Sequence, residues 1–177
     1  MGEHVILTRE RAIKEQLDTA IWLWFLSEPA SAVHALTDNA LTILHDVGGK
    51  IGKESHFYSK EMHKLHGRDR IKGLSNFLKH GSKDSKAAYK FSPVWTEGLM
   101  MDAINSVMKI YPPPSLLMAT CFARLLSVHF AAGRIDRTEA EKYLPKGVAL
   151  EEVTLLSKRK FLETILPLFV ERGLSEP

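Results

Sequence analysis

The sequence predicts an all-α protein, a single helical domain over residues 1–177 built as a bundle of about six to eight helices. Apolar residues recur at intervals of three and four along most of the chain, and no stretch of useful length alternates as a strand does. The composition, with 45% apolar and 25% charged residues, is ordinary for a globular domain. A chain of 177 residues can bury a core without disulfides or a structural metal.

Residues 9–48 read as an N-terminal helical hairpin. The first helix follows Thr8, a favourable N-cap, and runs to about Leu26, with one apolar stripe of Ile13, Leu17, Ile21 and Trp24. Ser27 and Pro29 begin a second helix that ends at Gly48 and Gly49. Its expected core face consists of Val33, Leu36, Ala40, Ile43, Leu44 and Val47. The short connection favours antiparallel packing of the two helices.

Residues 50–90 form a basic, His-rich segment in which the helical signal is weaker. We expect a loop that carries one short helix around residues 59–66. A longer helix begins near Asp69, places Ile71, Leu74 and Leu78 on one side, and ends at Gly81. Residues 82–92 read as a polar loop.

The C-terminal helices cover residues 93–173. Ser92 and Pro93 open a helix whose inward residues are Trp95, Leu99, Ala103, Val107 and Ile110. Three prolines at 112–114 break the chain, and Ser115 caps a helix over Leu116 to Phe130 that is apolar nearly all round and is therefore expected in the core or at a subunit interface. A short helix begins at Asp136. One last helix spans about Ala149 to Arg172, with a kink at Pro167.

Three features favour a cytoplasmic address. The lone cysteine, Cys121, cannot form an internal disulfide and lies in an apolar run, which is typical of a reducing compartment. The N-terminus lacks the basic and apolar regions of a secretory signal. No run of about 18 uncharged apolar residues indicates a membrane span, so we expect no membrane partner.

Positive charge is concentrated in the basic segment. Residues 1–49 carry three Lys/Arg against seven Asp/Glu, a net charge of −4, and residues 91–177 carry ten of each. Residues 50–90 carry eleven against four, a net charge of +7, together with four histidines. Such clustering favours a polyanionic partner, which could be RNA, a nucleotide or an acidic protein. The candidate contacts are Arg70, Lys72, Lys79 and Lys83, and the alternative is a solvated lysine-rich surface.

One helix face in this segment could carry chemistry. Lys72, Asn76 and His80 are spaced at four and four, so on a helix they lie along one side. Asn76 offers a donor and an acceptor, and His80 can exchange a proton near neutral pH. A helix C-terminus also favours the charged imidazolium. Asn76 and His80 are therefore candidates for phosphate contact or for acid catalysis on a phosphodiester, unless this face is only the wet side of an amphipathic helix.

The run from Ser75 to His80 resembles the Arg-Asn-x-x-x-His motif of the HEPN superfamily. That resemblance implies a compact helical bundle, often a homodimer, and many members are metal-independent RNases whose Arg and His meet across the dimer cleft. Asn76 and His80 match the motif, whereas Ser75 stands where the Arg belongs, so the guanidinium that would stabilise charge at the phosphate is missing. More broadly, residues 10–110 are similar to a group of uncharacterised bacterial all-helical proteins.

A second constellation lies on the second predicted helix. His34, Asp38 and His45 fall within about 40° of one another on the side opposite the predicted core stripe. A His/Asp/His set could ligate a divalent metal. Alternatively, this mixed face packs on a neighbouring helix, with its histidines hydrogen-bonded.

The sequence contains no P-loop, dinucleotide fingerprint, Cys/His zinc pattern or nucleophile elbow, and we expect no cofactor. The favoured function is that of an HEPN-like helical protein that binds RNA, nucleotide or another polyanion through its basic face. Two alternatives stay open. One is an enzyme, either a metal-dependent hydrolase or a residual metal-independent RNase, using His80 or the set of His34, Asp38 and His45. The other is a structural or regulatory homo-oligomer joined through the apolar helix over 116–130.

Overall fold

The computed structural model describes residues 6–79 and 88–171, apart from the side chains of Asp69 and Arg70. Within these residues the chain forms nine helices and no strand, which confirms the predicted all-α class. The helices are α1 (Arg9–Phe25), α2 (Ala30–Gly49), α3 (Lys60–His66), α4 (Arg68–Lys79), α5 (Pro93–Ile110), α6 (Leu116–Ala131), α7 (Arg137–Glu141), α8 (Leu150–Thr154) and α9 (Lys158–Glu171). None of them is both long enough and apolar enough to span a bilayer.

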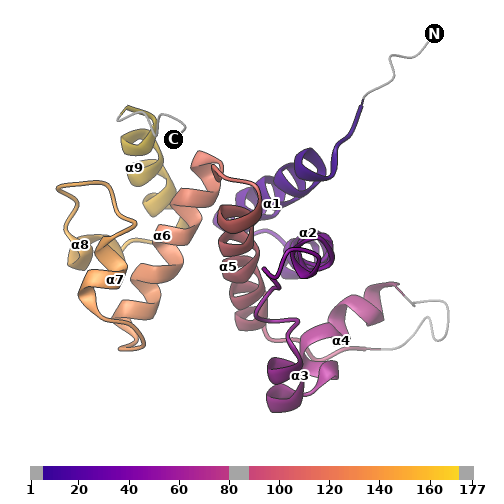
Figure 1. The fold of residues 1–177 in the computed structure, drawn as a ribbon. Coiled ribbons are helices and arrows are strands. Elements are labelled where there is room, and N and C mark those ends of the chain that lie inside the picture. The colour runs from indigo at the N-terminus through magenta and orange to yellow at the C-terminus, as the bar shows by residue number, and fades with distance from the viewer. Residues whose placement is uncertain (1–5, 80–87, 172–177) are drawn as a thin grey trace, which may run out of the picture.

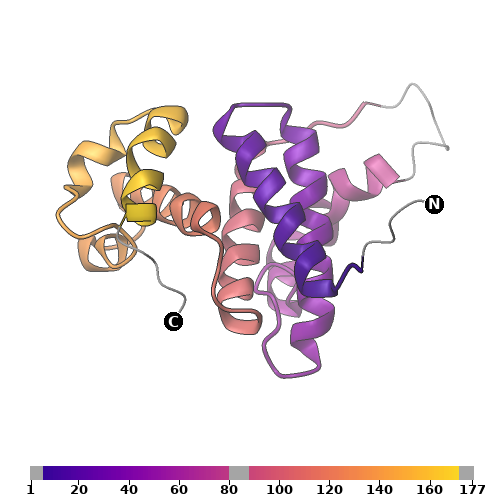
Figure 2. The same ribbon diagram turned by 90° about the horizontal axis from the view of Figure 1, so that it is seen from above.

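The helices are arranged in two groups on either side of α5 (Figure 1). Helices α1 and α2 form the predicted hairpin, and α2 packs extensively against both α1 and α5. Helices α3 and α4 lie at one end of this group, where α4 contacts α2. Helices α7, α8 and α9 gather around α6 on the opposite side of α5, and a view from above shows the same division (Figure 2). Helix α2 therefore has neighbours on more than one face.

One hydrophobic core joins the two groups of helices. The stripe predicted on α1 is buried, and so are Leu99, Ala103 and Val107 of α5. Helix α6 buries nine of its residues against α1, α5, α7, α8 and α9. Of the two places predicted for this apolar helix, the core is therefore the one that the fold uses. Cys121 is fully buried there.

Several helix starts were encoded by short polar side chains, as the sequence indicated. Thr8, Ser59, Ser115 and Asp136 each accept a hydrogen bond from the backbone N–H three residues on, which satisfies a donor that the first turn cannot pair internally. The start of α2 differs slightly from the prediction. Its N-cap is Pro29, and Ser27 lies in the preceding turn with a φ of 59°.

The prediction of one last helix from about Ala149 to Arg172 was wrong, because this stretch contains two helices, α8 and α9. The break follows from Arg124 on α6, which is only 8% exposed. Its guanidinium donates to the carbonyls of Val153, Thr154 and Leu156 over 3.0, 3.3 and 2.7 Å. These bonds satisfy carbonyl oxygens that the end of a helix leaves free. Ser157 then caps α9 by accepting from the N–H of Lys160 at 3.2 Å.

The face of α2 that was placed opposite the core is also buried. His34, Asp38 and Leu41 are at most 2% exposed. The reason is that α4 and α5 cover parts of α2 that the α1 contact leaves open. The alternative interpretation, in which this mixed face packs on neighbouring helices, is the one that the fold bears out.

Candidate functional site

Asp38 is a fully buried carboxylate that holds the basic segment against α2. Its side chain accepts a short hydrogen bond from the Tyr58 hydroxyl, just before α3. The ammonium groups of Lys79 and Lys72 on α4 lie 3.4 and 3.5 Å from its oxygens. Burial by itself would raise the pKa of Asp38, but the Tyr58 hydrogen bond and the positive charge of Lys72 outweigh it and lower the pKa. Asp38 is therefore ionised at neutral pH.

Two of the predicted polyanion contacts, Lys72 and Lys79, thus converge on a carboxylate. Lys72 is half-buried: its ammonium lies 3.4 Å from the centre of the Tyr58 ring and 3.1 Å from Thr42 Oγ1. Burial lowers the pKa of Lys72, against the opposing effect of Asp38. The side chain of Lys79 remains 51% exposed. The Arg70 side chain and Lys83 lie outside the described residues.

A second buried carboxylate, Asp102 on α5, fixes the loop before α3. It accepts from Ser55 Oγ at 2.8 Å and from the backbone N–H groups of His56 and Phe57 at 3.2 and 2.8 Å. Because Asp38 and Asp102 sit on different helices, they clamp residues 55–79 onto α2 and α5. Neither aspartate was singled out for this role by its sequence neighbourhood, since the partners are more than 19 positions away along the chain.

The two described positions of the HEPN-like motif, Ser75 and Asn76, lie on different sides of α4. Ser75, which stands at the arginine position of the motif, is only 2% exposed on the inner side of α4. Asn76 is exposed on the same helix. His80 lies outside the described residues. An arginine at position 75 would have to be buried between α4 and α2.

His34 is buried beside Asp38, one helical turn earlier on α2. Its Nδ1 lies 3.0 Å from the hydroxyl oxygen of Thr96 on α5, whereas its Nε2 is buried and has no hydrogen-bond partner among the residues that the structure describes. Burial lowers the pKa of His34, and the attraction of Asp38 only partly offsets it. The imidazole is therefore neutral at neutral pH, with one ring nitrogen unsatisfied.

The predicted His34, Asp38 and His45 set does not gather as a ligand group. His45 packs its ring edge-on against Tyr58, with 5.7 Å between the ring centroids, whereas His34 is bonded to Thr96. Over residues 6–79 and 88–171, no three His, Cys, Asp or Glu side chains are placed so that they could hold a metal ion.

An aromatic pocket of about 350 Å³ opens between α2, α4 and the start of α5. Its lining residues are His34, Leu74, Tyr89, Lys90, Phe91, Ser92 and Trp95. Four of these seven carry a ring, and three, Tyr89, Lys90 and Ser92, carry a hydroxyl or ammonium group. We call this cavity the aromatic pocket. The sequence interpretation missed it, because it placed residues 89–92 in a polar loop and Trp95 in the core.

Aromatic contacts hold the walls of the pocket. The Phe91 ring lies edge-on against His34, with centroids 5.3 Å apart. Tyr89 stacks on Phe77 of α4 at 5.6 Å. Trp95 contacts Phe57 and His66 edge-on, at 6.1 and 5.3 Å.

Two helical glycines make room for these rings. A Cβ at Gly98 would lie 2.5 Å from Cζ of Phe57, and a Cβ at Gly73 would overlap the hydroxyl of Tyr89. Real carbon atoms do not approach that closely, so a side chain at either position would push an aromatic ring out of place. Glycine inside a helix costs stability, and this was the one signal in the sequence that pointed to a close approach here.

Exposed cations lie on α3 and at the start of α4. Lys60 and Lys64 lie one turn apart on α3, Arg68 begins α4 after the turn at Gly67, and each of the three is exposed. Among the residues that the structure describes, none of the three is within ion-pair distance of a carboxylate. We call these three residues the basic face. His66 packs against Trp95 of the pocket from another side of α3 than the one that carries Lys60 and Lys64, so these two lysines lie on the side of α3 away from that contact.

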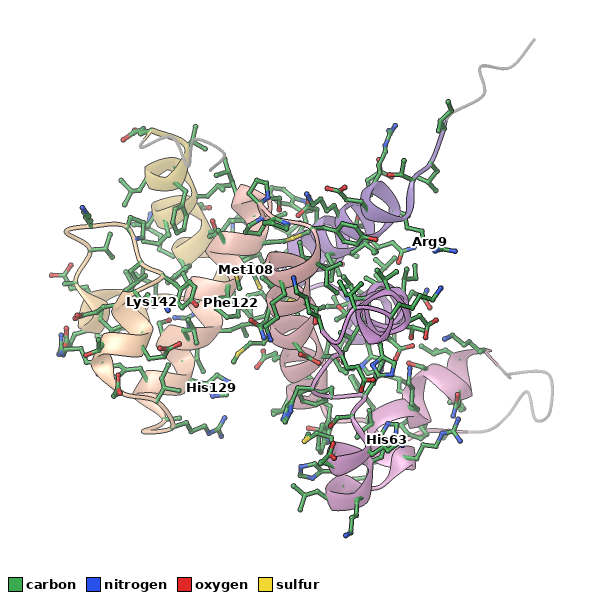
Figure 3. All side chains as sticks on the ribbon, viewed as in Figure 1. Arg9, His63, Met108, Phe122, His129 and Lys142 are labelled. Atoms are coloured by element: carbon green, nitrogen blue, oxygen red, sulfur yellow. The ribbon has the colours of Figure 1, made fainter. Side chains whose placement is uncertain are left out.

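The charged surface and the C-terminal helices are distant from each other. Figure 3 shows His63 on α3, whereas Phe122, His129 and Lys142 lie on the other side of α5. The candidate site therefore belongs to the group formed by α2, α3, α4 and α5.

The chain matches no known protein-family model, no curated protein and no solved structure.

Proposed function

We propose that the protein binds RNA, or a nucleotide, through the basic face and the aromatic pocket. The observation that carries this proposal is the aromatic pocket itself, in which the exposed Lys90 lines a cavity with four ring-bearing side chains, in the same group of helices as the exposed cations of α3 and α4. Single-stranded nucleic acids are bound by this combination, in which cations follow the phosphates and aromatic rings stack with bases.

The charge state of the basic face supports phosphate contact. Lys72 and Lys79 form ion pairs with Asp38, so their positive charge attracts a phosphate ligand less strongly. Lys60, Lys64 and Arg68 have no such partner among the described residues and remain exposed. Lys90, also exposed, lines the pocket itself. These four cations are therefore the proposed phosphate contacts in place of Lys72 and Lys79, whereas Arg70 and Lys83 stay candidates from the sequence.

The aromatic lining favours nucleic acid over an acidic protein. An acidic peptide needs cations alone, whereas a nucleotide also presents a flat heterocycle that stacks on rings. Tyr89, Phe91 and Trp95 would supply such surfaces without rearrangement of the helices.

The test is a titration of a fluorescent oligouridylate at several salt concentrations, with polyglutamate in parallel. We expect oligouridylate to bind at low salt, more tightly than polyglutamate does. Its affinity should fall steeply as the salt concentration rises. Equal binding of both polymers would favour an acidic protein partner. Absence of oligouridylate binding at the lowest salt would end the proposal.

The homodimer that the HEPN resemblance implies remains a proposal, and it would need an exposed apolar surface as its interface. Helix α6 buries its apolar side chains within the chain, so it offers little to a second copy. Trp22 and Leu26, one turn apart on α1, are 48% and 39% exposed and are the apolar residues from which an interface could grow. Light scattering of the wild type and of a Trp22→Ser variant tests this. A monomeric wild type would contradict it.

A further inference from the structure

We propose that the aromatic pocket is a subsite for one unpaired nucleobase and that His34 forms a hydrogen bond with the edge of that base. This inference rests on the proposed binding of RNA or nucleotide, and it adds a ligand class to it. A base that is paired inside a duplex cannot enter a pocket between helices. The protein would therefore recognise single-stranded RNA or a free nucleotide rather than an RNA helix.

The size and lining of the pocket fit a flat heterocycle. Its volume of about 350 Å³ lies at the small end of ligand pockets, which span roughly 300–1,000 Å³. Leu74 and the rings of Phe91 and Trp95 provide apolar walls, and Ser92 and Lys90 provide polar groups. An apolar pocket with few polar groups is the usual form of a small-molecule site, in which those groups fix the orientation of the ligand.

His34 supplies a second, independent observation that points to a ligand. It is 98% buried, it lines the pocket, and its Nε2 has no partner within residues 6–79 and 88–171. An unpaired buried polar atom destabilises the protein, and a hydrogen bond to a ligand would remove that cost. Nucleobases carry both donors and acceptors on their edges, so either tautomer of His34 finds a complement.

The bond between His34 and Thr96 orients the imidazole for this role. Because Nδ1 is held by the Thr96 hydroxyl at 3.0 Å, the ring is fixed with Nε2 as its free nitrogen. The edge of Phe91 packs on the same imidazole, so the incoming base takes the place of that edge and Phe91 turns to cover the base. Phe91 lies outside the helices, immediately before α5, where such a rotation costs little packing.

The rest of the site is held in place before any ligand binds. Asp38 anchors α4, which carries Leu74, and Asp102 anchors the loop that carries Phe57 against Trp95. A preformed pocket loses less entropy on binding than one that must be assembled.

The experiment compares oligouridylate with an abasic oligoribonucleotide of equal length, using full-length protein. The two probes share a backbone and differ in their bases alone. We expect about tenfold tighter binding of oligouridylate, which corresponds to the stacking of a single base. The difference should disappear in Trp95→Leu and in Phe91→Leu, and persist in Trp22→Leu, which removes an exposed tryptophan on α1. Two pocket variants are used so that one remains if the other fails to fold.

A second readout follows His34 directly. In protein with ¹⁵N-labelled histidine, the Nε2 resonance of His34 should shift when oligouridylate binds and stay in place with the abasic probe. Equal affinity of wild type for the two probes would overturn the base subsite and leave the phosphate contacts intact. A base preference that survives both pocket variants, or a His34 resonance that never moves, would also overturn it. If neither probe binds at low salt, the proposed function itself fails.

Discussion

His34 Nδ1 and Thr96 Oγ1 lie 3.0 Å apart across the contact between α2 and α5, and no other group of the described part of the chain forms a hydrogen bond with the imidazole. This pairing keeps a titratable ring inside the protein, 2% exposed, with one nitrogen satisfied and the other not. The ring is neutral because burial lowers its pKa. The same residue therefore couples folding to pH and forms a wall of the aromatic pocket.

The stability of the protein should fall as the pH drops below the ordinary histidine value of 6.5. In that range the unfolded chain takes up a proton at position 34, and the folded chain does so only at lower pH, because its pKa is depressed. The contribution of neutral His34 to the free energy of unfolding is thus fully present above pH 6.5. It is lost as the pH falls through the pKa that His34 has in the folded protein. Urea unfolding at a series of pH values between neutral and mildly acidic measures this.

A matched pair of variants assigns this effect to His34. His34→Gln should flatten the pH dependence, whereas His129→Gln should leave most of it, although burial lowers the pKa of His129 as well. The separate contribution of Asp38, whose pKa is lowered from 3.8, is lost only in stronger acid. Stability that stays constant or rises on mild acidification would show that His34 is not held neutral.

Asp38→Asn should destabilise the fold by about 2–4 kcal/mol, because it leaves Lys72 half-buried without its carboxylate. Lys79→Met, which removes the more exposed partner, should cost less than about 1 kcal/mol. Chemical denaturation of the two variants checks the contrast, with Asp46→Asn on the exposed side of α2 as the control. Equal effects of the Asp38 and Lys79 substitutions would contradict the anchor role of Asp38.

Arg124→Met should destabilise the protein by about 2–4 kcal/mol, because the carbonyls of Val153, Thr154 and Leu156 lose a charged donor in a partly buried setting. Arg124→Lys should recover only part of this loss, since an ammonium cannot reach three carbonyls as a planar guanidinium does. Hydrogen exchange should show faster opening of α8 and the start of α9. Arg134→Met, an exposed arginine, serves as the control, and equal effects of Arg124→Met and Arg134→Met would disprove the capping role.

Gly98→Ala should push Phe57 away from Trp95 and cost about 1–3 kcal/mol through overpacking. It should also weaken the preference for oligouridylate over the abasic probe, because Trp95 loses its support. Gly49→Ala is a suitable control: its added Cβ meets nothing closer than 3.7 Å, so stability should hold or rise slightly. Should Gly98→Ala be as stable as wild type, the close approach of Phe57 would not constrain the site.

The sequence predicted those features of the fold that depend on neighbours in the chain. Thr8, Ser115 and Asp136 each bond to a backbone group three residues away, so a local pattern was enough to identify them. The apolar run of α6 likewise indicated burial wherever the helix packed. The break between α8 and α9 was predictable only in part: Ser157 is a local N-cap for α9, but the bonds that end α8 come from Arg124, about 30 positions earlier.

The candidate site was predictable only in part, since its geometry comes from contacts between distant segments. The charge count located the basic segment. It could not show that Lys72 and Lys79 turn toward Asp38, which lies more than 30 positions away along the chain. The helical period identified the face shared by His34 and Asp38, but whether that face is wet or buried depends on where α4 and α5 lie. The pocket unites α2, α4 and residues 89–95, and no local pattern indicates such a meeting.

The central claim is that the basic face binds nucleic-acid phosphates, and the salt dependence of oligouridylate affinity tests it most directly. The triple variant Lys60→Gln, Lys64→Gln, Arg68→Gln is compared with a matched triple on the C-terminal helices, Lys142→Gln, Arg159→Gln, Lys160→Gln, whose side chains are also exposed. We expect the first triple variant to bind much more weakly. The slope of log K against log salt should become shallower by about 2, because three phosphate contacts are lost. The second triple should behave like wild type. Identical slopes for both triples and wild type would contradict the claim.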